Sequence, residues 1–222
     1  RNIFMKRYSI VLPYFAKASR GRLLEIGCST GTMLDIFAEY GWQTWGVEPS
    51  KSAHVASRKG HRILNTYFES LPAGRQGQLP KNYFDLVIAN HTLEHMDDPL
   101  LVLGKVHGLL KKNGIVYIDV PNAGGLGAKI LGKHWPYRLP EEHKHQFTRD
   151  SLSKIFKDAG FKVIHFESRS GLFEFANPWL ELWQSFTGMK KRFFTNVLTI
   201  PYSLVASALN SGDSMSLVGK KA

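Results

Sequence analysis

Two carboxylates and two glycines, placed where predicted strands end, carry the clearest chemical signal in this chain. Gly27 and Gly31 bracket a tight turn between a buried apolar strand and a predicted helix. Glycine lets the backbone of such a turn approach a ligand closely. Glu48 ends the next predicted strand, where a carboxylate can accept hydrogen bonds from the two hydroxyls of a ribose. Glu25 lies just before the turn, where an acid suits an ammonium group better than a pyrophosphate. The pattern predicts a site for a nucleoside that carries an ammonium group.

The loop from Glu25 to Gly31 resembles the E/D-x-G-x-G-x-G loop of the class I S-adenosylmethionine-dependent methyltransferases, with Ser29 at the middle glycine position. S-adenosylmethionine has an ammonium, a sulfonium and a ribose, and it has no phosphate. The resemblance implies cofactor contacts for a set of ten residues: Glu25, Gly27, Cys28, Ser29, Gly31, Glu48, Pro49, Phe68, Asn90 and His91.

Individual roles within this set also follow from the resemblance. Glu25 would face the ammonium group, Glu48 would bind the ribose, and Pro49 would lie against the adenine. Relatives often have an acid after the third strand that reads the adenine amino group. Tyr67 stands at that position here, so the expected adenine contact falls to the backbone of Phe68.

Two further blocks extend the resemblance over most of residues 22–161. The block 84–99, FDLVIANHTLEHMDDP, resembles the fourth-strand block of small-molecule methyltransferases. The block 139–148, LPEEHKHQFT, with the later AGF at 159–161, resembles a pattern of one broad methyltransferase subgroup. That subgroup includes ubiquinone-pathway and sugar or polyketide O-methyltransferases. The acceptor is therefore expected to be a small molecule such as a sugar, a quinone-like ring or an anionic or lipid-linked precursor.

Methyl transfer to a hydroxyl needs alignment, exclusion of water and a base. Histidine is the side chain best suited to accept a proton near neutral pH. The candidates are His143, then His95, followed by His91 and His145. For each of them the alternative is a structural histidine that caps a loop.

Other chemistries are less well supported by the residues. Glu94, His95, Asp97 and Asp98 suggest a metal, but groups so close together on one loop do not converge easily, so no metal is expected. A single cysteine, Cys28, excludes a disulfide framework and a Cys-rich zinc site, and a packing role suits it. Nucleic acid is not expected as the acceptor, because neither a Pro-Cys nucleophile nor an Asn/Asp-Pro-Pro-aromatic motif is present.

Alternating strand and helix patterns must position these residues. Strands are predicted at 22–26, 43–47, 62–65, 84–90, 114–120, 161–167 and 215–220, and helices at 2–20, 32–40, 50–59, 99–110 and 150–159. We expect Ser50 and Thr148 to cap two of these helices and Asn113-Gly114 to end a third. The alternation predicts an α/β, Rossmann-like doubly wound sheet of about seven strands, mainly parallel with an antiparallel last strand.

Three parts are expected within the 222 residues: an N-terminal helix (1–20), a cofactor-binding domain (21–171 with 212–222) and a helical insertion (172–211). Residues 72–80 are expected to form a polar, glycine-rich loop. The insertion is rich in aromatic residues around the basic run 190–192, which leaves two interpretations open. It is a lid over the active site, or it makes peripheral contact with a membrane surface.

Composition bounds the remaining possibilities. The net charge of +11 favours anionic partners in general, although a solvated basic surface explains it equally well. The first residues do not resemble a signal peptide, so a cytoplasmic location is expected. Peripheral attachment to the inner face of the membrane is the alternative. The chain begins at Arg1, which suggests that a segment precedes it.

Two alternatives to a methyltransferase remain open at this point. One is a non-catalytic protein of the same fold that binds S-adenosylmethionine. The other is a nicotinamide-dependent oxidoreductase, which would bind NAD instead.

Overall fold

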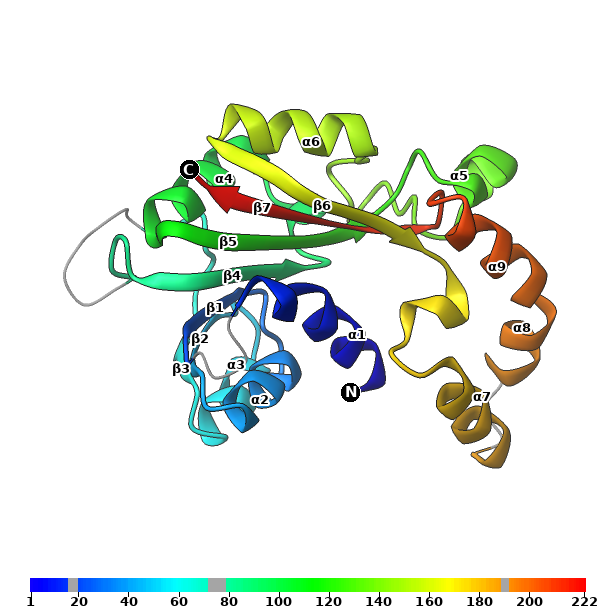
Figure 1. The fold of residues 1–222 in the computed structure, drawn as a ribbon, viewed down its shortest axis with the longest axis horizontal. Helices are drawn as coiled ribbons and strands as arrows, with labels where there is room; N and C mark the ends of the chain where they lie inside the picture. The colour runs from blue at the N-terminus through cyan, green and yellow to red at the C-terminus, as the bar shows by residue number, and fades with distance from the viewer. Residues whose placement is uncertain (16–19, 72–78, 189–191) are drawn as a thin grey trace.

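A mixed seven-stranded sheet forms the centre of the molecule, with the strand order β3-β2-β1-β4-β5-β7-β6 (Figure 1). The computed structural model describes residues 1–15, 20–71, 79–188 and 192–222. The strands are β1 (Arg22–Ile26), β2 (Gln43–Val47), β3 (Arg62–Leu64), β4 (Phe84–Asn90), β5 (Leu110–Pro121), β6 (Phe161–Arg169) and β7 (Ser214–Lys221). Strands β1 to β5 are parallel, whereas β7 runs antiparallel to both β5 and β6. The predicted doubly wound sheet with a reversed last strand is confirmed.

Helices cover both faces of this sheet (Figure 1). Helices α1 (Asn2–Val11), α2 (Thr32–Glu39) and α3 (Ala53–Arg58) pack on one face, and α4 (Pro99–Leu109) and α6 (Arg149–Asp158) pack on the other. Because side chains alternate along a strand, β4 sends Leu86 and Ile88 into the first core layer and Val87 and Ala89 into the second. A continuous apolar run is therefore what a strand covered on both faces requires.

The remaining helices gather beyond the carboxyl end of β5 (Figure 1). They are α5 (Leu126–Leu131), α7 (Pro178–Thr187), α8 (Arg192–Leu198) and α9 (Ile200–Ala208), and the last three belong to the segment 172–211. The basic run 190–192 and the loop at 72–80 lie largely outside the described residues.

Two predicted helix starts are confirmed by side-chain caps. Thr148 and Ser151 form a reciprocal capping box at α6, with the Ser151 amide donating to Thr148 Oγ1 over 3.2 Å. At α4 the carboxylate of Asp98 accepts a hydrogen bond of 2.9 Å from the Leu101 amide, immediately before Pro99. Both caps satisfy amide groups that a helix leaves unpaired at its first turn.

Three predicted boundaries were wrong. Helix α1 ends at Val11 instead of Arg20, because Pro13 has no N–H to continue the helix and its ring clashes with the preceding turn. Helix α3 begins at Ala53, so Ser52 and not Ser50 occupies its N-cap position, and the Ser52 side chain makes no capping hydrogen bond. Strand β5 begins at Leu110, and Asn113 adopts a φ of 63° within it instead of ending α4. Asparagine tolerates this left-handed conformation, so the Asn-Gly pair makes a local irregularity inside the strand.

Candidate functional site

A cavity of about 360 Å³ lies where β1, β2 and β4 end, at the carboxyl edge of the sheet. Ligands of open parallel sheets bind at this edge. Among the residues predicted to bind cofactor, Gly27, Pro49 and Phe68 line the cavity, and the catalytic candidate His95 joins them. Tyr67, which stands where relatives usually have an acid, also lines it.

The glycine turn is held in a shape that only glycine adopts easily. Gly27 and Gly31 have φ angles of 75° and 79°, and Ser29 between them has a φ of 47°. A Cβ on Gly27 would collide with the side chain of Thr92, which donates a hydrogen bond of 3.2 Å to the Ile26 carbonyl. Thr92 therefore holds the residues that follow β4 against the glycine turn, and both line the cavity.

Glu25 is a buried carboxylate that lacks a hydrogen bond to one of its oxygens. Glu25 is only 3% exposed, and its Oε2 atom has no hydrogen-bond partner among the described residues. Burial, followed by the charge of Glu48, raises its pKa well above the ordinary value. A bound ammonium group would reverse this effect, because an opposite charge favours the ionised carboxylate.

Glu48 is buried and already holds the loop around it. Its Oε2 accepts a hydrogen bond of 2.9 Å from the Ser29 amide, and its Oε1 accepts one of 2.8 Å from the Ser50 amide. Each carboxylate oxygen has a second lone pair. The arrangement leaves acceptor capacity for ribose hydroxyls and ties the glycine turn to the end of β2.

Two other cofactor candidates differ in their surroundings. Cys28 is buried with its Sγ against Gly46, and burial raises its pKa to about 12. This environment fits the packing role. The amide oxygen of Asn90, at the end of β4, is buried without a partner among the described residues. An unpaired buried acceptor of this kind fits a donor group on a ligand.

His95 and His143 are brought together although they lie in different blocks of the sequence. Their ring centroids are 4.8 Å apart at an angle of 71°. The Nδ1 of His95 lies 2.8 Å from the Glu142 carbonyl oxygen, and the Nδ1 of His143 lies 2.8 Å from the Tyr137 carbonyl oxygen. Since a carbonyl only accepts, both rings carry their proton on Nδ1 when neutral, and Nε2 is left with a lone pair.

The other two histidines lie in different environments. His91 has a φ of 49°, and its nitrogens lie 3.3 Å from Glu94 Oε1 and 3.5 Å from Asp119 Oδ1. Burial opposes its charged form, but the bond to Glu94 and the charge of Asp119 outweigh burial and raise the pKa of His91. His145 stacks on Phe147 at 5.7 Å. These contacts favour structural roles for both.

A buried ion pair that the sequence did not predict lies beside the site. Arg7 Nε on α1 lies 2.9 Å from Asp119 Oδ2 at the end of β5, and both side chains are 4% exposed. The hydroxyls of Tyr117, Ser214 and Ser216 also donate to Asp119. Asp119 is the single acid in the otherwise apolar run 115–120, and this pattern could have identified one half of the ion pair.

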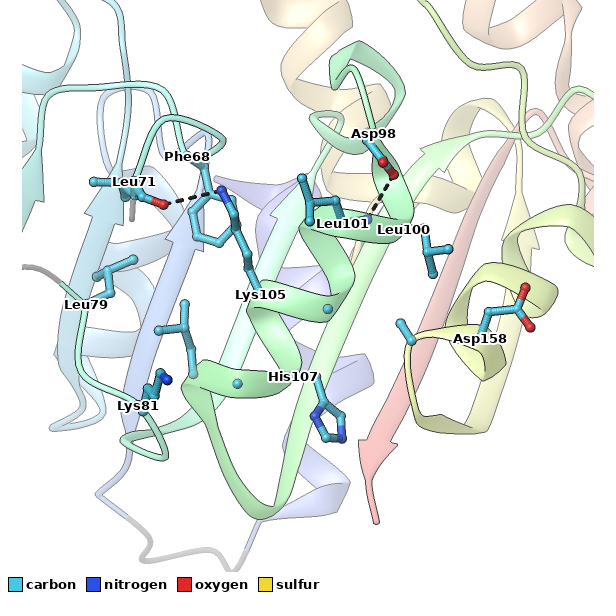
Figure 2. A pocket seen from close by; sticks show the side chains of 14 residues that line it. Phe68, Leu71, Leu79, Lys81, Asp98, Leu100, Leu101, Lys105, His107 and Asp158 are labelled. Carbon is cyan, nitrogen blue, oxygen red and sulfur yellow. Dashed lines mark hydrogen bonds between the residues drawn. The ribbon is translucent and has the colours of Figure 1, made fainter. Parts of the chain in front are cut away.

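A larger cavity of about 700 Å³ lies beside α4, away from these groups (Figure 2). Leu71, Leu79 and Leu101 surround it, and Lys105 donates a hydrogen bond of 3.3 Å to the Leu71 carbonyl. Of the predicted cofactor residues, only Phe68 lines it. The smaller cavity is the candidate cofactor site, because the glycine turn meets the strand ends there. Within the described residues, no helix is both long and apolar enough to cross a bilayer.

The chain is similar to known methyltransferases in sequence and in fold. A family model described as a methyltransferase domain matches residues 4–166. The ubiquinone biosynthesis O-methyltransferase of Bradyrhizobium sp. (strain ORS 278) is 28% identical over 171 residues, which are 71% of this chain and 64% of that protein. The corresponding enzyme of Rhodopseudomonas palustris (strain BisB5) is 26% identical over 81% of this chain and 72% of its own length. The chain therefore spans about two thirds of these relatives.

Solved structures share the fold. An S-adenosylmethionine-dependent methyltransferase from Archaeoglobus fulgidus is 21% identical, with a TM-score of 0.63 over 100% of this chain and 95% of that one. The 1,6-didemethyltoxoflavin-N1-methyltransferase of Burkholderia thailandensis, solved with S-adenosylhomocysteine, is 17% identical, with a TM-score of 0.63 over 99% of this chain and 78% of its own. Given the family match and the shared fold, this chain belongs to the class I S-adenosylmethionine-dependent methyltransferases.

Proposed function

We propose that this protein transfers the methyl group of S-adenosylmethionine to a hydroxyl of a small molecule, with His143 as the base. The observation that carries the proposal is the pairing of His143 and His95, whose Nδ1 atoms are both held by carbonyls while His95 lines the cofactor cavity. The similarity to ubiquinone O-methyltransferases supports an oxygen acceptor. Family membership favours this activity over a nicotinamide-dependent oxidoreductase.

The reaction is a direct displacement. A lone pair of the acceptor oxygen attacks the methyl carbon, the carbon–sulfur bond breaks, and its electron pair stays on sulfur, which leaves as the neutral thioether of S-adenosylhomocysteine. The hydroxyl proton passes to Nε2 of His143. The protein contributes alignment, exclusion of water and this proton acceptor.

The test compares turnover with cofactor affinity in His143→Ala. A panel of catechols, hydroxylated quinols and sugars is incubated with S-adenosylmethionine, and release of S-adenosylhomocysteine is measured. We expect turnover of an accepted substrate to fall about 100-fold or more, because a general base contributes about that factor. The dissociation constant for S-adenosylhomocysteine should change little. Equal losses of turnover and affinity would remove His143 from the role of base, and cofactor binding with no turnover on any acceptor would favour a non-catalytic protein.

For the acceptor, we propose an anionic or lipid-linked molecule reached through the segment 172–211. Its helices α7 and α8 expose Trp179 (78%), Trp183, Phe186 and Phe194. Aromatic side chains next to basic residues suit an anionic bilayer surface, and the chain carries a net charge of +11.

Vesicle sedimentation separates membrane contact from the lid interpretation. The protein should sediment with vesicles that contain phosphatidylglycerol and stay in solution with pure phosphatidylcholine. The double variant Trp179→Ser/Trp183→Ser should lose this binding, while Val55→Ser, an exposed position on α3, should keep it. If the double variant lowers turnover on a water-soluble acceptor and sedimentation is absent throughout, the segment acts as a lid.

A further inference from the structure

The cavity of about 700 Å³ beside α4 lies apart from the glycine turn and from the paired histidines. Its walls come from α4, from the stretch after β3 and from the end of α6, and leucine side chains form much of them. Two of these, Leu100 and Leu101 of α4, are 44% and 55% exposed. Sites for small molecules are typically apolar hollows of about 300–1,000 Å³ with a few polar groups. The size and the lining of this cavity fit such a ligand.

Two glycines leave the backbone of α4 bare on the cavity side. Gly104 and Gly108 both line the cavity and lie about one helical turn apart. Among the described residues, no atom lies within 4 Å of the position that a Cβ would take on either glycine. Glycine weakens a helix, and close packing against the described chain does not explain its presence here. A bare backbone of this kind lets an apolar chain lie directly along the helix.

The charged groups around the cavity do not balance. Lys81, Asp98, Lys105 and Asp158 line it. Both acids are engaged, since Asp98 caps α4 and Asp158 lies 3.6 Å from Nζ of Lys154. Neither Lys81 nor Lys105 has a carboxylate partner among the described residues. The cavity therefore carries uncompensated positive charge, which complements an anionic group on an apolar ligand.

Lys105 is the half-buried member of this set. Its ammonium group donates hydrogen bonds of 2.5 Å to the Glu69 carbonyl and 3.3 Å to the Leu71 carbonyl, the second of which is drawn in Figure 2. An ammonium group has three N–H donors, so one remains. Carbonyls accept hydrogen bonds without neutralising the charge, and a charge removed from water is costly unless it is paired. Residues 72–78, outside the described residues, read PAGRQGQ and contain no acid to pair with it.

We propose that this cavity binds an amphipathic carboxylate of the fatty-acid class. The apolar chain lies along Gly104 and Gly108, and the carboxylate accepts a hydrogen bond from Lys105. Lys81, exposed near the end of α4, adds positive charge at the rim (Figure 2). The site goes beyond methyl transfer, because only Phe68 lines both this cavity and the candidate cofactor cavity. The carboxylate and the cofactor can therefore be bound at the same time.

Calorimetry on the full chain tests the site. Decanoate is the probe, and 1-decanol has the same chain without the charge. We expect one decanoate per chain and at least about tenfold weaker binding of 1-decanol, because a hydrogen bond between charged groups contributes that factor or more. Decanoate binding should persist when S-adenosylhomocysteine saturates the protein. Equal affinity for the two probes, or loss of decanoate binding with S-adenosylhomocysteine present, overturns the proposal.

Gly104→Leu fills the cavity without disturbing α4. Leucine favours a helix more than glycine does, and no described atom lies within 4 Å of the new Cβ. We expect decanoate binding to weaken at least about tenfold, since forcing an extra side chain into an occupied space costs that much or more. Ser57→Leu, at an exposed position on α3, is the matched control and should bind decanoate as the parent does.

Substitutions of Lys105 test the charge. Lys105→Met should remove the preference for decanoate over 1-decanol, and Lys105→Arg should keep it. A purely structural role would lower the affinity for both probes alike, and that result contradicts the proposal. Circular dichroism melting checks that Lys105→Met folds, and Gly104→Leu keeps the test decisive if it does not.

The exposed aromatic side chains of α7 offer decanoate another place to bind. The double variant Trp179→Ser/Trp183→Ser controls for it and should bind decanoate as the parent does. Binding that survives Gly104→Leu, or that disappears with the two tryptophans, overturns the proposal. None of these measurements depends on methyl transfer, so a failure here leaves the proposed function untouched.

Discussion

At the scale of single residues, the proposed cofactor site contains two buried acids with different surroundings. Glu48 is satisfied by two backbone amides, whereas Glu25 has an oxygen with no partner among the described residues. A buried polar group without a partner is costly, so Glu25 gains most from a cationic ligand. Glu48 stabilises the loop first and has acceptor capacity left for a ribose.

We predict that Glu48→Ala weakens binding of S-adenosylhomocysteine at least about tenfold, because hydrogen bonds to a charged group are worth about 1.5–3 kcal/mol. Isothermal calorimetry measures the dissociation constant. Glu39→Ala is the control, since this acid lies on the surface at the end of α2, paired with Arg1. A dissociation constant that Glu48→Ala leaves unchanged would contradict the ribose assignment.

At the scale of elements, α1 is attached to the carboxyl edge of the sheet by a buried ion pair. Arg7 extends from α1 to Asp119 at the end of β5, and three hydroxyls share that carboxylate. Burial favours the neutral acid, but the charges of Arg7 and His91 and the hydrogen bonds from Ser214 and Tyr117 together outweigh burial and lower the pKa of Asp119. The ion pair therefore fixes the N-terminal helix against the end of β5.

Removing one member of the pair should destabilise the protein strongly. We predict that Arg7→Met lowers the free energy of unfolding by about 3–5 kcal/mol, because it leaves a buried charge uncompensated. Urea denaturation provides the measurement. The double variant Arg7→Met/Asp119→Asn should recover part of the loss, since the remaining charge is gone. Single and double variants of equal stability would show that the charge of Asp119 does not need Arg7.

At the scale of the whole molecule, Glu174 couples stability to pH. Burial, followed by the charge of Asp119, raises its pKa to about 7. The small cavity around it brings together charged groups of three elements, which are Lys6 and Arg7 of α1, Asp119 of β5, and Glu167 and Arg169 of β6. A carboxyl whose pKa is raised on folding contributes stability below its ordinary pKa, and this contribution is lost as the pH rises through the folded value.

The sign gives a direct test with Glu174→Gln. Between about pH 5 and about pH 8 the parent should lose stability relative to this variant, because only the parent must bury a charge at the higher pH. The difference should grow by about 1–2 kcal/mol, less than the full shift implies because the side chain is partly exposed. Urea denaturation at both pH values measures it, with Glu141→Gln at an exposed position as the control. A difference that is constant with pH would contradict the raised pKa.

The sequence by itself determined the sheet and the glycine turn after β1. Strand β4 is recognisable from its unbroken apolar run, the turn from Gly27 and Gly31, and the start of α6 from Thr148. These features follow from forces between near neighbours, namely burial on both faces, positive φ angles and capping of free amides. The end of α1 is also determined by a near neighbour, because Pro13 stops the helix, but the prediction of a helix to Arg20 overlooked this effect of Pro13.

Only the tertiary structure decided which distant side chains meet. Glu94 and His143, like Arg7 and Asp119, are far apart in the chain and come together because the strands end at one edge of the sheet. No local pattern encodes such a meeting, because it depends on the path of segments such as the one before α6. Hydrogen bonding then sets the tautomers: the carbonyls of Glu142 and Tyr137 fix the proton of His95 and His143 on Nδ1, in a cluster with the buried carboxylate of Glu94.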